Sequence, residues 1–316
     1  MMSLPMVRTL PGTFPEAEFL LVIKQEYAPL LTYFDIPGTV IPFDKTQYSG
    51  VSGQIRFGRM IRQHYHPDIF CSLPDSLSSA IIGYTSGAKV RIGYGGQWRS
   101  TLLTHAYDKP QGLHRAQEYL YLVNKFTGKE TSIDFNPVIT PRHLPTDRKL
   151  KLLLNINSEA SSRRMPIDFA TNLLQALINT GLFEIYLSGG PRDVTHVNAL
   201  PQELLTHASV HNLAGKTKLA ALFELIRTMD IALSTDSGIA HVCNALGIPL
   251  VVLFGAGDEN NTGPVNRSIA RVVRLEALHC APCLSNTCRY NDPVCIRGIQ
   301  IERIVKELVS SFLVKP

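Results

Sequence analysis

Two consecutive strand-to-turn transitions in residues 233–264 constrain the fold of this chain more than any other feature. The stretch reads LSTDSGIAHVCNALGIPLVVLFGAGDENNTGP, and the apolar run Ile231–Ser234 leads into it. This run is typical of a buried parallel strand, and it stops at the turn formed by residues 235–238, where an apolar helical face begins. A second buried strand, Pro249–Phe254, ends in the small-residue turn Gly255-Ala256-Gly257. The repetition of strand, turn and helix predicts a doubly wound parallel sheet with a ligand crevice at the carboxyl ends of its strands.

The polar turn between the first strand and its helix is the predicted ligand contact. Asp236, Ser237 and Gly238 stand where the helix begins, so backbone N–H groups and the positive end of the helix dipole face the crevice. An anion or a group of sugar hydroxyls suits such a turn. A purely structural interpretation stays open, in which Asp236 caps its helix and His241 is a satisfied interior histidine.

The order of residues around this turn resembles the C-terminal signature of glycosyltransferase family 9. The signature has Asp-Ser-Gly, two residues and His before Ala-Leu-Gly-Ile-Pro, then an apolar strand, Phe-Gly and a later Gly-Pro. The family contains the ADP-heptose:lipopolysaccharide heptosyltransferases, and residues 74–103 are more similar to their second inner-core type than to their first. The resemblance implies a GT-B fold, in which two Rossmann-like doubly wound domains face each other. It also implies that Asp236, Ser237, Gly238 and His241 bind the diphosphate and sugar of a donor.

The length and charge of the chain limit its organisation and its partners. At 316 residues it is long enough for two domains of about 150 residues each. Its net charge of +5 and pI near 8.9 suit an acidic ligand or an anionic membrane surface, but they are too weak to indicate nucleic acid. No run approaches the roughly 18 apolar residues that a membrane-spanning helix needs, and no signal peptide is recognisable. We therefore expect a cytoplasmic protein.

Residues 1–140 are expected to form the acceptor-side Rossmann-like domain. Strands and helices alternate there, and the predicted helix Ser52–His64 carries a stripe of arginines, which reads either as a solvated face or as a contact for a phosphorylated acceptor. Ser76 stands between a strand end and a helix start, and Arg99 lies in a loop after the next strand. The resemblance implies that both face the crevice from the acceptor side.

The N-terminus departs from this pattern, because a predicted helix at Leu4–Leu10 comes before any strand. A doubly wound domain usually begins with a strand and a glycine turn that leads to the first helix. Family members have a strand ending in a Gly-Asp turn there, and its aspartate is their proposed catalytic base. We expect the first strand to be absent and the catalytic residue to be unknown, with Asp75 as a weak substitute. A misplaced start site, a truncation or impaired catalysis would each account for the difference.

Residues 141–298 are expected to form the donor domain, after a proline-containing linker at residues 134–150. A predicted strand at Lys151–Ile156 is followed by small polar residues and then by a helix start at Pro166, a pattern that suits a pyrophosphate, although an ordinary surface loop stays open. The resemblance implies that Ser158 and Arg163 contact the diphosphate and that Thr217 lies near the adenosine. The final helix, in residues 299–316, is expected to pack back on the first domain.

Four cysteines gather in one loop near the C-terminus, and they are Cys280, Cys283, Cys288 and Cys295. Four thiolates could hold Zn²⁺ or an iron–sulfur cluster, but their spacing fits neither common pattern well. We favour free or paired thiols over a structural metal, and we expect no chemistry there.

These features predict a two-lobed site for a nucleotide sugar. The resemblance implies that the chain is a glycosyltransferase that moves a heptosyl residue from ADP-heptose to the inner core of lipopolysaccharide, without a cofactor or a metal. The sequence has no Asp-x-Asp metal clamp, so helix N-termini and Arg163 would stabilise the leaving group. The lipid-anchored acceptor implies peripheral contact with the cytoplasmic face of the inner membrane. One alternative is a truncated or impaired member that binds a sugar nucleotide or core oligosaccharide without transfer. A nicotinamide oxidoreductase is set aside, because no third glycine follows Gly255-Ala256-Gly257 at the required spacing.

Overall fold

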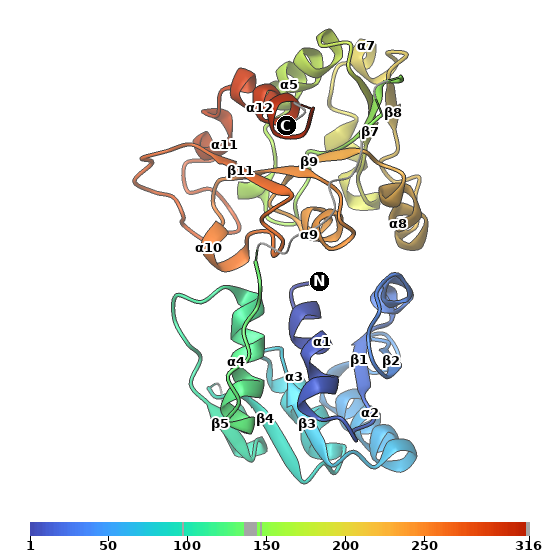
Figure 1. The fold of residues 1–316 in the computed structure, drawn as a ribbon, viewed down its shortest axis with the longest axis vertical. Coiled ribbons are helices and arrows are strands. Elements are labelled where there is room, and N and C mark those ends of the chain that lie inside the picture. Colours follow the sequence, from blue (N-terminus) through green and yellow to red (C-terminus); the bar gives the residue numbers. More distant parts are fainter. Residues whose placement is uncertain (97, 136–143, 146, 314–316) are drawn as a thin grey trace. The chain divides into compact units, whose positions relative to one another are not determined.

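The chain divides into two compact units, Met2–Ile133 and Asp134–Pro316, with Met1 grouped with the second. The computed structural model describes residues 1–96, 98–135, 144–145 and 147–313. Each unit combines parallel strands with helices (Figure 1), as the sequence predicts for Rossmann-like domains. The predicted domain boundary after residue 140 and most of the predicted linker lie outside the described residues.

The first unit follows the predicted alternation closely. Its elements in chain order are α1 (Leu4–Thr13), β1 (Leu20–Lys24), the 3₁₀ segment η1 (Gln25–Tyr33), β2 (Thr39–Phe43), α2 (Gly50–Tyr65), β3 (Ile69–Ser72), α3 (Leu77–Thr85), β4 (Val90–Tyr94), η2 (Arg99–Leu102), β5 (His105–Tyr107) and α4 (Arg115–Thr127). The predicted helix at Leu4–Leu10 is confirmed as α1. Sequence analysis missed β5, because three residues are too short to show a period.

The parallel strands of the first unit form two sheets among the described residues. β1 pairs with β2, and β4 pairs with both β3 and β5, while no pairing joins β1 to β3. Helices α1 and α4 contact each other and share an apolar cluster with Leu21 of β1 and with Leu73, which directly follows β3. A second cluster joins Leu20 of β1 and Phe70 of β3 to helices α2 and α3. The two sheets are therefore held by side-chain packing instead of by a common hydrogen-bond ladder.

Local chemistry explains where several helices of this unit begin and end. α3 begins after Ser76, whose hydroxyl accepts the N–H of Ser79 at 3.3 Å. α4 begins after His114, which accepts the N–H of Ala116 through its ring nitrogen. It ends at Gly128, whose φ of 70° is the left-handed conformation that glycine adopts without strain.

The second unit contains the stretch on which the sequence analysis rests. Its elements in chain order are β6 (Leu150–Asn155), η3 (Ser161–Arg163), α5 (Ile167–Asn179), β7 (Phe183–Leu187), η4 (Pro191–Asp193), α6 (Val194–Val197), α7 (Gln202–Leu205), β8 (Val210–Asn212), α8 (Leu219–Arg227), β9 (Ile231–Thr235), α9 (Gly238–Ala245), β10 (Leu250–Phe254), α10 (Glu259–Thr262), β11 (Ala270–Arg274), α11 (Val294–Arg297) and α12 (Ile301–Leu313). The strands predicted on either side of the polar turn are confirmed as β9 and β10, and the strand predicted at Lys151–Ile156 is confirmed as β6, whereas β11 was not predicted.

The strands of this unit form one parallel sheet in the order β11-β10-β9-β6-β7-β8. The chain adds β7 and β8 on one side of β6, and then returns to add β9, β10 and β11 on the other side. The order therefore reverses between β6 and β9. In open α/β sheets, ligands bind at the carboxyl ends of the strands beside such a reversal.

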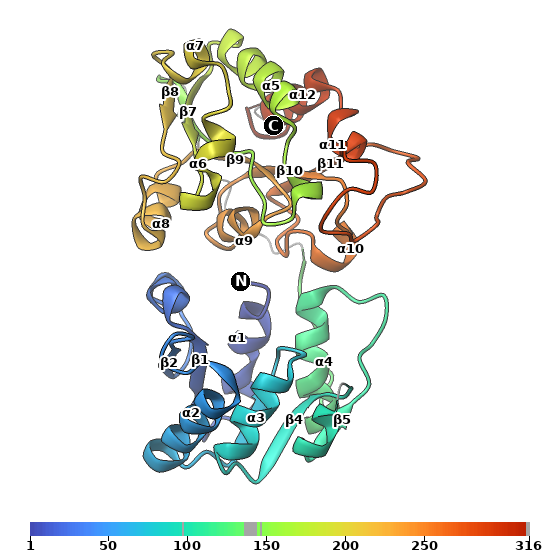
Figure 2. The same cartoon turned by 180° about the vertical axis from the view of Figure 1, so that it is seen from behind.

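The core covers both faces of this sheet. Side chains alternate along β6, so Leu152 and Leu154 pack on one face and Leu153 packs on the other. The first face is covered by α5 and α12, which lie side by side (Figures 1 and 2), and the second is covered by α8 and α9. Burial on both faces explains why these strands appear in the sequence as continuous apolar runs.

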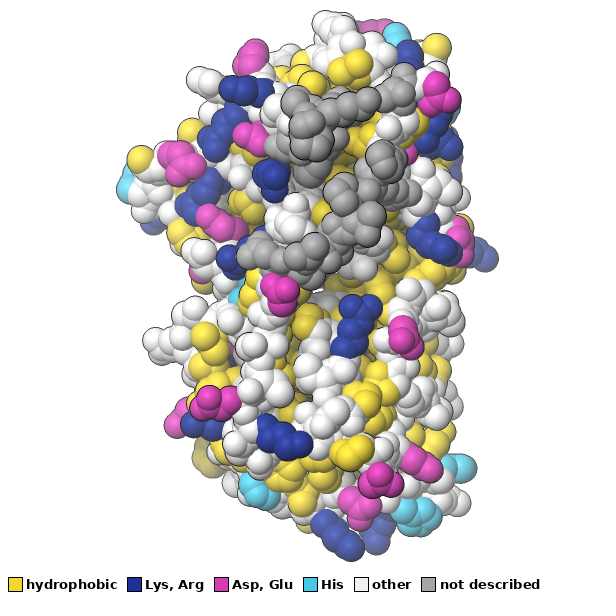
Figure 3. Space-filling view, in the orientation of Figure 1, with side chains coloured by type: hydrophobic (Ala, Val, Ile, Leu, Met, Phe, Trp, Pro, Cys, Tyr) yellow, Lys and Arg dark blue, Asp and Glu magenta, His cyan; other side chains and the backbone are white. Residues whose placement is uncertain are grey.

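The C-terminal helix α12 uses its apolar face within the second unit. Ile304 and Leu308 are fully buried in the same cluster as the side chains of α5. The expectation that this helix packs on the first domain stays a prediction. Within the described residues, no helix has both the length and the apolar content to cross a membrane. Lysine and arginine are interspersed with aspartate and glutamate on the face drawn in Figure 3, as the small net charge leads one to expect.

Candidate active site

The candidate site lies at the carboxyl ends of β6, β9 and β10, where three turns meet. β9 pairs with β6 through Asn155 and Ser234, and it pairs with β10 on its other side. The polar residues after β6, the turn after β9 and the small-residue turn after β10 therefore share one edge of the sheet, called the donor edge below. Since this edge includes the strand-order reversal, the fold brings together the residues that the sequence placed in two separate motifs.

A buried asparagine joins the first two turns, and sequence analysis missed it. The Asn155 side-chain amide donates to the hydroxyls of Ser234 and Ser237 at 3.0 and 2.9 Å, and to the carbonyl of Asn157 at 3.0 Å. That carbonyl also accepts the hydroxyl of Thr235 at 2.6 Å. Buried polar groups need such partners, so these bonds fix the turn after β9 against the end of β6. The available signal was a polar residue directly after the apolar run Leu152–Leu154.

Ser158 strengthens the same junction. Its hydroxyl donates to the backbone carbonyl of Asp236 at 3.1 Å, and its side chain is buried. This residue was predicted to contact a diphosphate. In the structure its hydroxyl proton is engaged by the turn that carries Asp236, so Ser158 holds that turn in place.

Arg163 and Asp236 form an ion pair at the centre of the donor edge. A terminal guanidinium nitrogen of Arg163 lies 3.5 Å from Oδ2 of Asp236, and Asp236 is only 4% exposed. Burial raises the pKa of the Asp236 carboxyl, and the Arg163 guanidinium acts against this rise. The pair places a partly exposed cation above a buried carboxylate, so the residue predicted to hold phosphate and the residue predicted to hold the donor sugar are neighbours.

Gly257, in the turn after β10, packs directly against the carboxylate of Asp236. A Cβ atom at this position would lie 2.1 Å from Oδ2 of Asp236, which is far inside van der Waals contact. Only glycine allows the backbone to approach the aspartate so closely. The glycine turn that the sequence analysis noted as a strand end therefore shapes the surroundings of Asp236.

The N-terminus of α9 completes the edge. Ser237 is the residue before the helix, and its hydroxyl lies 3.1 Å from that of Ser234. No atom lies within 4 Å of the position that a Cβ of Gly238 would occupy, so the first turn of the helix is open on that side. His241 lies one turn into the helix and is partly buried. Asp236 makes no cap, and the α9 amides and helix dipole favour a negatively charged group.

The predicted acceptor-side residues belong to the first unit, where Arg99 holds a turn together. Its side chain is 1% exposed and donates to the Pro74 carbonyl at 2.9 Å and to the Ser72 hydroxyl at 3.0 Å. Burial lowers the pKa of the Arg99 guanidinium, and Asp75, 3.7 Å away, acts in the opposite direction. Arg99 is thus engaged within its own unit, while Ser76 caps α3. Direct contact of either residue with an acceptor stays a prediction.

Asp75, the weak candidate for a catalytic base, is also engaged within this unit. Lys109 donates to its carboxylate at 2.8 Å, and Lys109 lies 3.3 Å from the buried carboxylate of Glu118. The carboxylates of Asp75 and Glu118 thus share this lysine. A base that must accept a proton from a hydroxyl needs a free lone pair within hydrogen-bond reach of it, so the ion pair does not favour Asp75 for this role.

Comparison with known protein families decides the class of the chain. The model of glycosyltransferase family 9 (heptosyltransferase) matches residues 54–293, which is more than half of the sequence. The chain belongs to glycosyltransferase family 9. The match includes both the donor edge and the loops of the first unit that contain Asp75 and Arg99.

Individual members of family 9 are similar along most of their length. Lipopolysaccharide heptosyltransferase 2 of Escherichia coli is 27% identical over 87% of this chain and 84% of its own length. The enzyme of the same name from Salmonella typhimurium is 28% identical over the same shares. Among solved structures, E. coli ADP-heptose lipopolysaccharide heptosyltransferase II aligns with a TM-score of 0.76 at 23% identity and covers 99% of this chain and 94% of its own. A family 9 glycosyltransferase from Veillonella parvula aligns with a TM-score of 0.83 at 19% identity, covering 99% and 93%. These structures share the predicted GT-B fold.

The remaining predicted donor residue of this family 9 chain, Thr217, lies beyond β8 at the same edge of the sheet. β8 is two strands away from β6, which corresponds to about 10 Å across the sheet. Thr217 is therefore separated from the Arg163–Asp236 pair, on the side where β7 and β8 end. The predicted contact of Thr217 with an adenosine stays a prediction.

The four cysteines of the family 9 chain are free thiols. Cys280, Cys283 and Cys288 lie in the irregular segment between β11 and α11, and Cys295 lies in the first turn of α11. Burial and the nearby Cys288, Cys280 and Cys283 raise the pKa of Cys295 to about 11. Nowhere in the part of the chain that the structure describes do three His, Cys, Asp or Glu side chains group as ligands for a metal ion. The arrangement therefore offers no preformed metal site in the described loop.

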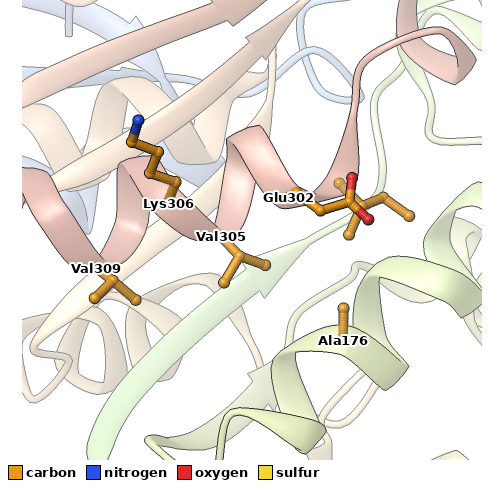
Figure 4. A pocket seen from close by; sticks show the side chains of 6 residues that line it. Ala176, Glu302, Val305, Lys306 and Val309 are labelled. Atoms are coloured by element: carbon orange, nitrogen blue, oxygen red, sulfur yellow. The ribbon is translucent and has the colours of Figure 1, made fainter.

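Two surface hollows elsewhere in the molecule lack the chemistry of the donor edge. One is lined by Arg8, Pro11, Asp35 and Pro37. The other runs between α5 and α12, where Ala176, Val305 and Val309 give it an apolar floor and Glu302 and Lys306 stand beside it (Figure 4). The charged side chains that line both hollows are exposed, so neither hollow has a buried ion pair among its described residues. The second hollow includes the start of α12 at Ile301 and Glu302, where an acidic side chain already stands at the helix N-terminus. We therefore take the donor edge as the candidate active site.

Proposed function

We propose that this chain transfers a heptosyl residue from ADP-heptose to a sugar of the lipopolysaccharide core. The observation that carries this proposal is the Arg163–Asp236 pair beside the open N-terminus of α9 at the strand-order reversal. Membership of family 9 and the similarity to lipopolysaccharide heptosyltransferases support the choice of sugar and acceptor. The donor would be a nucleotide sugar, since this edge offers a cation and backbone amides to a diphosphate.

The transfer exchanges one C–O bond for another at the anomeric carbon. The oxygen of an acceptor hydroxyl forms a bond to this carbon, while the bond from the carbon to the β-phosphate oxygen breaks and ADP leaves. Negative charge therefore grows on the diphosphate in the transition state. Arg163 and the amides at the start of α9 are placed to stabilise that charge, which is the requirement for electrostatic catalysis.

The other residues of the donor edge would orient the donor. The carboxylate of Asp236 can accept hydrogen bonds from sugar hydroxyls, and His241 lies one turn away on the same helix. Thr217, about two strands from the diphosphate site, would lie near the adenosine. The acceptor hydroxyl would also need a base to accept its proton, and Asp75 stays the weak candidate for this role.

The proposed acceptor also determines where in the cell the enzyme would act. A lipopolysaccharide core is anchored to lipid, so the enzyme would act at the cytoplasmic face of the inner membrane as a peripheral protein. The excess of basic over acidic residues, 31 to 26, favours approach to an anionic lipid surface.

A donor screen tests this function. The purified chain would be incubated with a heptose-containing core acceptor and with ADP-heptose, ADP-glucose or UDP-glucose, and nucleoside diphosphate release and acceptor mass would be measured. We expect ADP release and a heptosylated acceptor only with ADP-heptose. Binding of ADP-heptose without any product would point to a member that binds its donor and does not transfer. Product from UDP-glucose would contradict the proposed donor.

A further inference from the structure

The four-cysteine loop, residues 280–295, makes direct contacts with both outer turns of the donor edge. The carbonyl of Ser285 accepts the hydroxyl of Ser162 at 2.5 Å. The carbonyl of Asn286 accepts the backbone N–H of Ser162 and the hydroxyl of Ser161, each at 3.2 Å. These bonds hold η3, the short segment that ends in Arg163.

The same loop also holds the turn after β10. The backbone N–H of Leu284 donates to the carbonyl of Ala256 at 2.8 Å. Where this segment enters α11, the sulfur of Cys295 lies against Gly255, and an added Cβ there would approach it to 2.7 Å. Ile296, the next residue, is fully buried in the core and anchors this end of the loop.

The two turns carry the groups that define the donor edge. Ser162 directly precedes Arg163, and Ala256 directly precedes Gly257, which packs over Asp236. The loop is therefore a bridge between the segment that carries the cation and the segment that confines the carboxylate. Its contacts to η3 and to Ala256 use backbone groups, while side chains such as Leu284 are exposed.

We propose that the four-cysteine loop is a positioning element of the donor site, which sets the place of the Arg163 guanidinium relative to Asp236 through Ser162 and Ala256. The inference rests on the proposed function, because it assigns Arg163 to the donor diphosphate. The loop touches the supporting segments and does not itself have to touch the donor. Arg163 has a side chain that is 28% exposed, so without a fixed backbone it would sample many orientations.

Ser162 is the position at which this proposal can be tested, because its side chain makes a bond to the loop and none to Arg163 or Asp236. Ser285 is an exposed residue, so water can replace the lost hydroxyl at its carbonyl in Ser162→Ala and the fold should survive. We expect Ser162→Ala to weaken ADP binding about three- to tenfold in calorimetry and to leave adenosine binding unchanged, since only ADP uses the arginine. Thr206→Ala is the matched control, because Thr206, which directly follows α7, makes the same kind of hydroxyl-to-carbonyl bond to Gln202.

A double variant distinguishes a specific effect on the position of Arg163 from a general loosening of the donor edge. If Ser162 acts through Arg163, then adding Ser162→Ala to Arg163→Ala should cause no further loss of ADP affinity. An additional loss in the Arg163→Ala background, or equal weakening of ADP and adenosine, would overturn the proposal.

A measurement without ligand keeps the test independent of the proposed function. Hydrogen exchange of the amides at residues 161–163 should become faster in Ser162→Ala and stay unchanged in Thr206→Ala. Failure of the wild type to bind ADP would reject the proposed function alone, whereas unchanged exchange at these amides would reject the positioning role.

Discussion

The guanidinium of Arg163 lies 3.5 Å from the carboxylate of Asp236, although 72 residues separate the two in the chain. Arg163 ends the segment after β6, and Asp236 follows β9, the neighbouring strand across the order reversal. A buried carboxylate is costly without a partner, so the arginine stabilises the charged form of Asp236. When a diphosphate binds, it competes with Asp236 for the same cation, which makes this pair the most informative target for mutation.

Replacing Arg163 by alanine should weaken ADP binding at least tenfold, or about 1.4 kcal/mol. The affinity for adenosine should not change, because adenosine has no phosphate for the arginine. Isothermal calorimetry with both ligands measures the difference. Arg227→Ala removes an exposed arginine of α8 and serves as the control. Unchanged ADP affinity in Arg163→Ala would remove this residue from the site.

Asp236→Asn is expected to abolish transfer and leave the chain folded. Asparagine has nearly the same shape, but its amide lacks the charge and presents a donor where sugar hydroxyls need an acceptor. Since the buried carboxylate carries a desolvation cost, its loss should not lower the melting temperature appreciably. ADP release and thermal unfolding measure the two effects. Surviving turnover would show that the donor site is wrongly assigned.

The stability of the same variant relative to wild type should depend on pH. Burial raises the pKa of Asp236 in the folded chain above its value in the unfolded chain. Between these two pKa values the folded state binds more protons, so the wild type loses stability as pH rises. The neutral asparagine has no such loss. Denaturant unfolding measured at increasing pH, starting from the ordinary aspartate pKa of about 4, should therefore show Asp236→Asn gaining stability relative to wild type, and a constant difference would contradict this.

Gly257→Ala should reduce transfer more than tenfold. The added methyl group would lie 2.1 Å from Oδ2 of Asp236, so either the carboxylate or the turn after β10 has to move. Gly12→Ala is the control, because no atom lies within 4 Å of its Cβ position and alanine favours the α1 helix. Steady-state rates of ADP release compare the two variants. Wild-type activity in Gly257→Ala would show that the placement of Asp236 does not limit catalysis.

Asn155→Leu should destabilise the second unit by about 1–3 kcal/mol, because it removes a buried donor from two hydroxyls and one carbonyl. The turn after β9 would lose its tie to β6, so ADP affinity should fall as well. Urea unfolding and calorimetry measure both quantities. The exposed Gln175→Leu is the matched control, since its amide bonds only Asn179 on the same helix. Full stability of Asn155→Leu would mean that the remaining bonds suffice to hold the junction.

Much of the fold followed from local patterns that the sequence contains by itself. The apolar runs in β6 (Leu152–Leu154), β9 (Ile231–Leu233) and β10 are continuous because both faces of these strands are buried. Helix α3 begins after Ser76 because a serine can cap it. Strand, turn and helix in succession predicted parallel sheets with polar turns at one edge. Strands β5 and β11 were not predicted from the sequence, because β5 has only three residues and both are edge strands of mixed burial without a clear apolar period.

Only the tertiary structure decided which of these turns meet. The order reversal between β6 and β9 brings Asn155 to Ser237, Arg163 to Asp236 and the four-cysteine loop to Ser162. The local sequence indicates that each of these strands is followed by a polar turn, but it does not indicate which strands are neighbours in the sheet. The neighbour of each strand is set by the packing of the whole unit, through helices that cover both faces, and so the contacts between distant residues could not be predicted from the pattern of the chain.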